Sequence, residues 1–194
     1  LLNVGLLHTA LAGRPDHAPY APTTVDRLSS KGYAYWALGH VHRAEVVSRD
    51  PWIVFPGNLQ GRSIRETGEK GFVVISSEGT EVTGVETVAS DVARWHDLSV
   101  DVSSARNADD ALTLVQRALD AAAAASEGRL VAARVRLTGR GPVHTALVRD
   151  VAATEANVRA SGADANGDVW VEKVVVQTLP EVDLEKVRER KDAL

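Results

Sequence analysis

The feature that most restricts the fold is a strand, helix, strand order near the start of the chain. An apolar run at residues 3–7 and a second one at residues 33–38 flank "TTVDRLSSKG". In that segment Thr23 or Thr24 suits a helix N-cap, and Gly32 suits a helix end. A helix between two buried strands predicts a layered α/β arrangement.

The pattern of the remaining sequence predicts two domains and a tail. The first domain, residues 1–90, is completed by strands expected at residues 45–48, 52–55, 71–76 and 81–88. The second, smaller domain covers residues 91–180. It is expected to contain strands at 96–102, 130–138 and 169–178, and helices at 108–126 and 143–160. A short charged helix is expected at residues 181–194. The predicted fold class is α/β, or α+β.

The composition narrows the kinds of site that this chain can carry. The sequence contains no cysteine, so a metal site must use nitrogen and oxygen ligands. The net charge of −4 does not favour nucleic-acid binding by bulk charge, although local basic patches are still compatible with it. No run of 18 apolar residues and no secretory signal is present in the sequence, so we expect no membrane span and a cytoplasmic location.

Two histidines follow the second predicted strand, in "YWALGHVHRAEV". Strand alternation places His40 and His42 on the same side, with Val41 in the core, and Gly39 permits a close turn. His8 ends the first strand in an equivalent place. Three imidazoles at adjacent strand ends suit manganese, iron or zinc. The alternative is that these are ordinary turn histidines that donate to backbone carbonyls, and spacing alone leaves both interpretations open.

Three stretches carry a resemblance to a known family: "GLLHT", "YWALGHVH" and "FPGNLQGRSIRETGEKGFVVI". Together they resemble the C-terminal half of calcineurin-like metallophosphoesterases, in particular bacterial DNA-repair exonucleases of the SbcD and YhaO type. The resemblance covers most of residues 1–88, and the later order of strands and helices is similar to that family's capping domain. It implies the C-terminal half of a β-sandwich flanked by helices, followed by a small α+β capping domain.

The resemblance also implies a site with two divalent metal ions, usually manganese. His8 and His40 would be ligands of one ion and His42 a ligand of the other. Such a pair activates a shared water that attacks phosphorus, so the implied activity is hydrolysis of DNA phosphodiester bonds. The family's Asp-x-His, Gly-Asp and Gly-Asn-His-Asp motifs do not precede the histidines in this sequence, and the Gly167-Asp168 pair lies in the second domain. We therefore expect weak metal binding at most, and no catalysis by this chain alone.

Two groups of polar residues are candidates for contact with a phosphodiester. Asn58, Arg62 and Arg65 lie in and after a Pro-Gly-Asn loop, which forms either a site wall or a plain turn. Arg134 and Arg136 share one face of a predicted strand. They either contact phosphate or form a solvated face paired with Asp97 and Asp101.

The expected partners follow from the resemblance: DNA as substrate, and an SbcC-like ABC-type coiled-coil ATPase in the complete protein. Association into a homodimer is also expected, through apolar surface left on the incomplete sandwich. Two alternative functions stay open. One is a non-catalytic module that binds DNA ends or a partner, and the other is a small-molecule phosphodiesterase of the same superfamily. A capping domain favours the nuclease branch.

Overall fold

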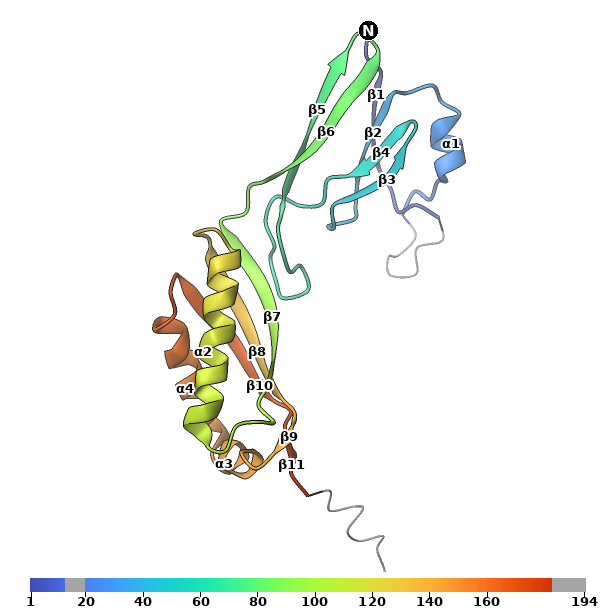
Figure 1. The fold of residues 1–194 in the computed structure, drawn as a ribbon. Coiled ribbons are helices and arrows are strands. Elements are labelled where there is room, and N and C mark those ends of the chain that lie inside the picture. The colour runs from blue at the N-terminus through green and yellow to red at the C-terminus, as the bar shows by residue number, and fades with distance from the viewer. Residues whose placement is uncertain (13–19, 183–194) are drawn as a thin grey trace, which may run out of the picture. The chain divides into compact units, whose positions relative to one another are not determined.

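The computed structural model describes residues 1–12 and 20–182, so the charged helix expected at residues 181–194 lies almost entirely outside the described residues. The chain divides into two compact units, Leu1–Val92 and Ala93–Leu194, shown in Figure 1. Both units combine strands with helices, which confirms the expected mixed α/β class. Among the described residues, no helix has both the length and the apolar character needed to cross a membrane.

The first unit contains a four-stranded sheet in the order β1-β2-β4-β3. Its strands are β1 (Val4–His8), β2 (Tyr35–Gly39), β3 (Glu45–Arg49) and β4 (Trp52–Phe55). β1, β2 and β4 run parallel, and β3 is antiparallel to β4. The parallel register places His8 opposite Gly39, so β1 and β2 end at the same edge of the sheet.

A short helix, α1 (Val25–Ser29), connects β1 to β2 as the sequence predicted. Thr24 caps it, because its side chain accepts a hydrogen bond from the Arg27 backbone nitrogen at 3.3 Å. The Trp36 indole nitrogen donates to the Leu28 carbonyl at 3.1 Å and ties the helix to the sheet. The side chains of Leu28 and Trp36 are buried with those of Leu38, Ile53 and Phe55. Together they form the apolar core of the unit.

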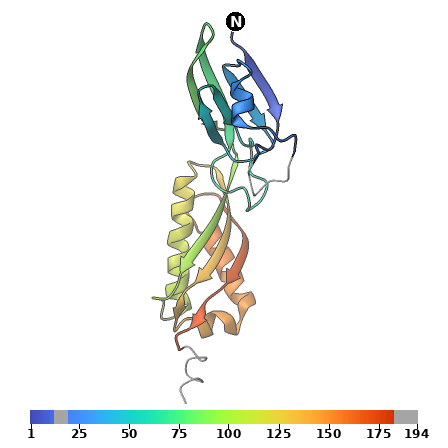
Figure 2. The same ribbon diagram turned by 90° about the vertical axis from the view of Figure 1, so that its right-hand side faces the viewer.

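A long antiparallel hairpin completes the first unit. It consists of β5 (Gly71–Glu78) and β6 (Glu81–Ala89), which appear in green in Figure 2. Gly79 has a φ of 62° at its turn. The backbone nitrogen of Gly71 donates to the Asn58 carbonyl at 3.1 Å, so the start of the hairpin is joined to the loop that follows β4.

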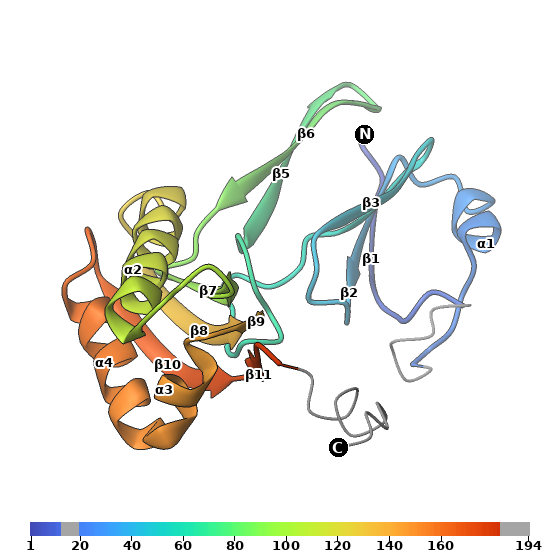
Figure 3. The ribbon, with the colours of Figure 1, turned by 60° about the horizontal axis from the view of Figure 1, so that its bottom comes forward.

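The second unit is a three-stranded sheet in the order β10-β8-β7, with all strands parallel. Helices lie on one face of this sheet, as Figure 3 shows. The core joins Val115 and Leu119 of a helix to Val131 and Val135 of the central strand, all fully buried. The elements are β7 (Ala93–Asp101), α2 (Ala108–Ala125), β8 (Leu130–Thr138), β9 (Arg140–Gly141), α3 (His144–Arg149), α4 (Val151–Ala163), β10 (Val169–Val176) and β11 (Leu179–Pro180).

One predicted element of the second unit is wrong. The sequence predicted a single helix at residues 143–160, but the structure has α3 and α4 with a break at Asp150. Asp150 has φ −141° and ψ 89°, and its side chain accepts a hydrogen bond from the Ala153 backbone nitrogen at 2.9 Å. Asp150 therefore caps a new helix instead of continuing the old one.

Candidate functional site

The carboxyl ends of β1 and β2 bring His8 and His40 together. The backbone nitrogen of Thr9 donates to the Gly39 carbonyl at 3.3 Å, which extends the strand pairing past His8. A Cβ on Gly39 would lie only 2.8 Å from His8 Nδ1, so this position accommodates the imidazole because it has no side chain. His40 follows with a φ of 96°, a conformation that non-glycine residues rarely adopt and that often occurs at functional sites.

Three rings form a cluster at this edge. The centroids of the His8 and His40 rings are 5.3 Å apart, with the rings nearly perpendicular. Tyr20 stacks on His40 at 5.6 Å and meets the edge of His8 at 5.3 Å. The Tyr20 carbonyl accepts a hydrogen bond from the Ala10 backbone nitrogen at 2.8 Å, which holds the ring beside the strand end. The sequence reasoning missed Tyr20, and the aromatic residue in the Pro- and His-rich loop was the only available signal.

His42 has a different set of neighbours. β2 ends at Gly39, so strand alternation does not continue through the segment that carries the two histidines. Val41 is buried in the core, as expected from the sequence. The Nδ1 atom of His42 lies 2.7 Å from Glu66 Oε1. The structure therefore places His40 against His8 and Tyr20, and His42 against a carboxylate.

Glu66 is the centre of a hydrogen-bond network that the sequence reasoning missed. Its carboxylate accepts from Asn58 Nδ2 at 2.9 Å and from the Arg62 backbone nitrogen at 2.8 Å, in addition to His42. The side chain is only 15% exposed. Burial by itself would raise the pKa of Glu66, but the hydrogen bonds from Arg62, His42 and Asn58 outweigh it and lower the pKa to about 2.

The charge of Glu66 determines which nitrogen of His42 is available. An ionised carboxylate only accepts hydrogen bonds, so the proton between the two groups belongs to His42 Nδ1. Nε2 is then the nitrogen with a free lone pair. A histidine that binds a metal commonly donates its other ring N–H to a carboxylate in this way.

The Pro-Gly-Asn loop lies against the histidine segment. Gly57 has a φ of 79°, and a Cβ there would be 2.9 Å from the Ala44 backbone nitrogen and 3.1 Å from the His42 carbonyl oxygen. Asn58 Nδ2 donates to the Gln60 carbonyl and to Glu66. Asn58 Oδ1 is buried and has no hydrogen-bond partner among the described residues. Because buried acceptors normally have a partner, this oxygen is available to a donor or a cation.

These donors meet part of the requirement of a divalent-metal site. Imidazole nitrogens and an amide oxygen suit a transition metal. However, residues 1–12 and 20–182 contain no group of three His, Cys, Asp or Glu side chains placed to hold an ion. The assignment of His8 and His40 to one ion and His42 to another stays a prediction.

The two arginines predicted beside the site differ in their surroundings. Arg62 Nη2 lies 3.3 Å from His42 Nδ1 and 3.5 Å from Glu66 Oε1, and its side chain is 70% exposed. Arg65 lines a pocket of about 500 Å³ together with His42. Contact of Asn58, Arg62 and Arg65 with a substrate stays a prediction.

The two arginines of the second unit are both in ion pairs. Arg134 donates three hydrogen bonds of 3.0–3.1 Å to the Glu172 carboxylate, and Arg136 donates to Asp97 at 2.7 and 3.0 Å. The hydrogen bond from Arg136 lowers the pKa of Asp97. Asp101 accepts instead from the Ser103 backbone nitrogen at 2.9 Å. Phosphate contact by Arg134 and Arg136 stays a prediction that competes with these pairs.

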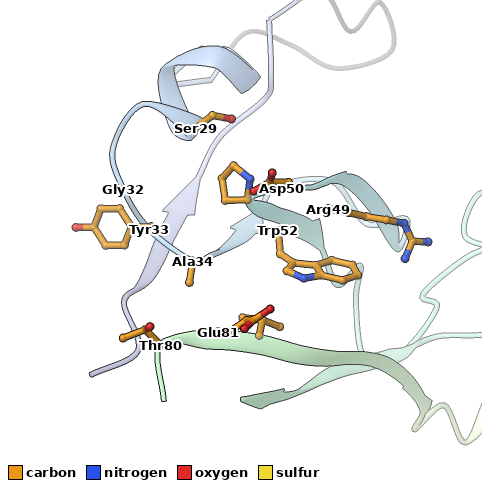
Figure 4. Close-up of a pocket in the computed structure, with 11 residues that line it drawn as sticks. Ser29, Gly32, Tyr33, Ala34, Arg49, Asp50, Trp52, Thr80 and Glu81 are labelled. Carbon is orange, nitrogen blue, oxygen red and sulfur yellow. The ribbon is translucent and has the colours of Figure 1, made fainter. Parts of the chain in front are cut away.

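A second pocket of the first unit has about 630 Å³ and lies at the other end of the sheet (Figure 4). Its lining includes Tyr33 before β2, Trp52 at the start of β4 and Glu81 at the start of β6. The Arg49 guanidinium lies 5.2 Å from the centre of the Trp52 ring. In layered α/β folds ligands bind at the carboxyl ends of the strands, which favours the histidine edge as the functional site.

Replacement of Gly39, which lies against the His8 ring, tests the packing at this edge of the sheet. Replacing Gly39 with Ala is expected to displace the His8 ring and lower the free energy of unfolding by about 1–3 kcal/mol, the usual cost of an overpacked contact. The ring signals of His8 and His40 in NMR spectra should both shift. Gly84→Ala is the control, because a Cβ there meets Ser76 at an ordinary 3.5 Å. Unchanged ring signals in the Gly39 variant would contradict the described packing.

Comparison with known proteins gives two matches. Residues 95–179 match the family described as "Metallophosphoesterase YhaO, middle domain". The chain is also 36% identical over 141 residues to a protein of Bacillus subtilis (strain 168) named "Uncharacterized metallophosphoesterase YhaO". The aligned part is 72% of this chain and 34% of that relative, so the chain spans about a third of the relative's length.

These two matches show that the chain is similar to metallophosphoesterase YhaO over the matched residues. The residues that match the YhaO middle domain make up most of the second unit. The resemblance found in the sequence is confirmed at this level.

Proposed function

We propose that this chain is part of a divalent-metal-dependent phosphodiesterase, an exonuclease of DNA repair that hydrolyses DNA phosphodiester bonds. The proposal rests on the arrangement of histidines at the carboxyl ends of β1 and β2 in the first unit. There the rings of His8 and His40 are in contact, and a buried carboxylate orients His42 with Nε2 available. This arrangement suits metal ligation, because a histidine that binds a metal commonly donates its other ring N–H to a carboxylate.

Each residue has a stated role in the proposed reaction. His8 and His40 would hold one ion, and His42 would hold the other through Nε2. When bound, two divalent ions, most simply Mn²⁺, would lower the pKa of a shared water and neutralise charge on the phosphate. Glu66 keeps the His42 ring in place, and Arg62 and Arg65 would orient the phosphodiester. Asn58 Oδ1 is available to a ligand or a cation.

The wider proposal concerns assembly. The second unit would act as the capping domain, and the complete protein would work with an SbcC-like ABC-type coiled-coil ATPase in the cytoplasm. Association into a homodimer has support in the edge strand β1, where Leu6 is 80% exposed. This chain alone is expected to be inactive, because the described ligands form an incomplete set.

Calorimetric titration with Mn²⁺ and Zn²⁺ tests the ligand assignment. Weak binding is expected for the unaltered chain, and its loss is expected in the His40→Ala variant. His144→Ala is the matched control, because that histidine is bonded to Thr178 in the second unit. Identical binding by the His40 variant would show that His40 is not a ligand. In the same preparations, strong Mn²⁺-dependent cleavage of duplex ends would refute the expected inactivity.

A second candidate function is a non-catalytic module that binds DNA ends or a partner protein. It is favoured by one observation, the lack of a group of three ligand side chains within the described part of the chain. DNA binding that is unchanged by metal ions and by His40→Ala would support this candidate over the phosphodiesterase.

A further inference from the structure

The pocket beside His42 has a composition that the metal site does not explain. It has about 500 Å³ and is lined by Val41, His42 and Arg43 from the loop after β2, and by Arg65, Glu66, Thr67 and Lys70 from the segment before β5. Two chain segments far apart in sequence therefore form one concave surface in the first unit. Of these lining residues, His42 and Arg65 were candidates from the sequence.

The charges in this pocket are unbalanced. It has three cationic side chains, Arg43, Arg65 and Lys70, and one acid, Glu66. The Glu66 carboxylate is already used by hydrogen bonds from His42, Asn58 and the Arg62 backbone. Within the described part of the chain, no ion pair involves Arg43, Arg65 or Lys70. Like charges in a concave surface attract an anion of opposite sign more strongly than the same charges on a flat surface.

The backbone that carries these cations is held at several points. The Lys70 carbonyl accepts hydrogen bonds from the Ser90 and Asp91 backbone nitrogens at 3.0 and 3.2 Å. The Pro-Gly-Asn loop lies between the two segments, with Gly57 packed on the backbone of Ala44 and Asn58 bonded to Glu66. The cations are therefore presented by a fixed frame, which reduces the entropy cost of binding a ligand.

We propose that Arg43, Arg65 and Lys70 form a subsite for a phosphate group of a nucleic-acid strand, next to the phosphodiester at the histidine edge. Guanidinium groups bind phosphate oxygens through paired hydrogen bonds, and an ammonium adds a point charge. His42 belongs both to this pocket and to the candidate metal edge, so a strand bound at one would extend into the other. The choice of a strand rests on the proposed function, whereas the phosphate chemistry follows from the pocket itself.

Binding of a fluorescent single-stranded thymidine oligonucleotide, in EDTA and over a range of salt concentrations, tests this subsite. The Arg43→Ala/Lys70→Ala double variant should bind on the order of tenfold more weakly at low salt. The slope of log K against log salt should fall by about 1.4, since each phosphate contact with a single strand contributes about 0.7. Arg27→Ala/Lys31→Ala removes the same charge from exposed positions and should leave both values near those of the unaltered chain.

A slope in the Arg43/Lys70 variant equal to that of the unaltered chain would overturn the proposal. Competition with inorganic pyrophosphate distinguishes the two sources of phosphate. If pyrophosphate at equal concentration displaced the oligonucleotide, the pocket would bind a small polyphosphate and the proposed nucleic-acid strand would be refuted as its ligand. Because EDTA removes metal ions, failure of the phosphodiesterase proposal would leave these results unchanged, so the two proposals fail separately.

Discussion

Replacement of Glu66 by Gln is expected to lower the free energy of unfolding of the first unit by about 2 kcal/mol, because charged hydrogen bonds of this kind contribute about 1.5–3 kcal/mol. The amide keeps the shape of the carboxyl group but loses its charge and one acceptor oxygen. Three donors depend on that group: His42 Nδ1, Asn58 Nδ2 and the Arg62 backbone nitrogen. Amide hydrogen exchange should therefore become faster at residues 41–46 and 58–62. Glu86→Gln, at an exposed position on β6, is the control.

The same network makes stability depend on acid pH. The pKa of Glu66 is about 2 in the folded chain, below its ordinary value of 4.5. A lowered folded pKa means that the stabilisation is fully present above pH 4.5 and is lost as pH falls from there toward 2. The unaltered chain should lose up to about 3 kcal/mol over this window, and less where solvent screens the charges. Acid unfolding curves that coincide for the unaltered chain and the Glu66 variant would rule out this role.

Replacement of Phe55 by Ala is expected to lower the free energy of unfolding by about 3–5 kcal/mol, the usual cost of a large cavity in a core. Phe55 is fully buried in the cluster with Trp36, Leu38 and Ile53. It is also the last residue of β4, immediately before the Pro-Gly-Asn loop. Loss of its ring should therefore release Asn58 and Glu66 as well as weaken the core.

Hydrogen exchange in increasing denaturant measures this effect separately for β2 and β4. Phe72→Ala is the control, since Phe72 is 41% exposed on the hairpin and its removal leaves no cavity. Equal losses of stability in the two variants would show that Phe55 is not the anchor of the loop. Faster exchange in β4 together with unchanged exchange at residues 58–62 would separate the core from the site.

The sequence predicted the fold best where local pattern and burial agree. β4 and β8 occupy the predicted residues, because apolar runs and alternation set both their limits. The prediction of one helix at residues 143–160 was wrong. Asp150 does not interrupt the helical periodicity of the sequence, and its hydrogen bond from the Ala153 backbone nitrogen is visible only in the structure. A side-chain cap then decides against the longer helix.

The candidate site was only partly predictable for a related reason. The meeting of His8 and His40 follows from parallel strands that end at one edge, which the sequence indicates. Tyr20 and Glu66 lie in loops without a repeating pattern, and their importance comes from contacts across 12 to 24 positions of the chain. The basic pocket is similar, because Arg43 and Lys70 meet only through the packing of two distant segments.

The backbone of His40 places two opposing demands on one position. Its φ of 96° favours glycine, and a non-glycine residue there costs on the order of 1–3 kcal/mol. Folding alone would thus select glycine, and only a task for the imidazole would select histidine against that cost. Among related chains with the same strand end, the residue at this position should therefore indicate whether the imidazole still has a function. Lineages that still need the ring should retain histidine, and lineages that have abandoned it should drift to glycine or asparagine.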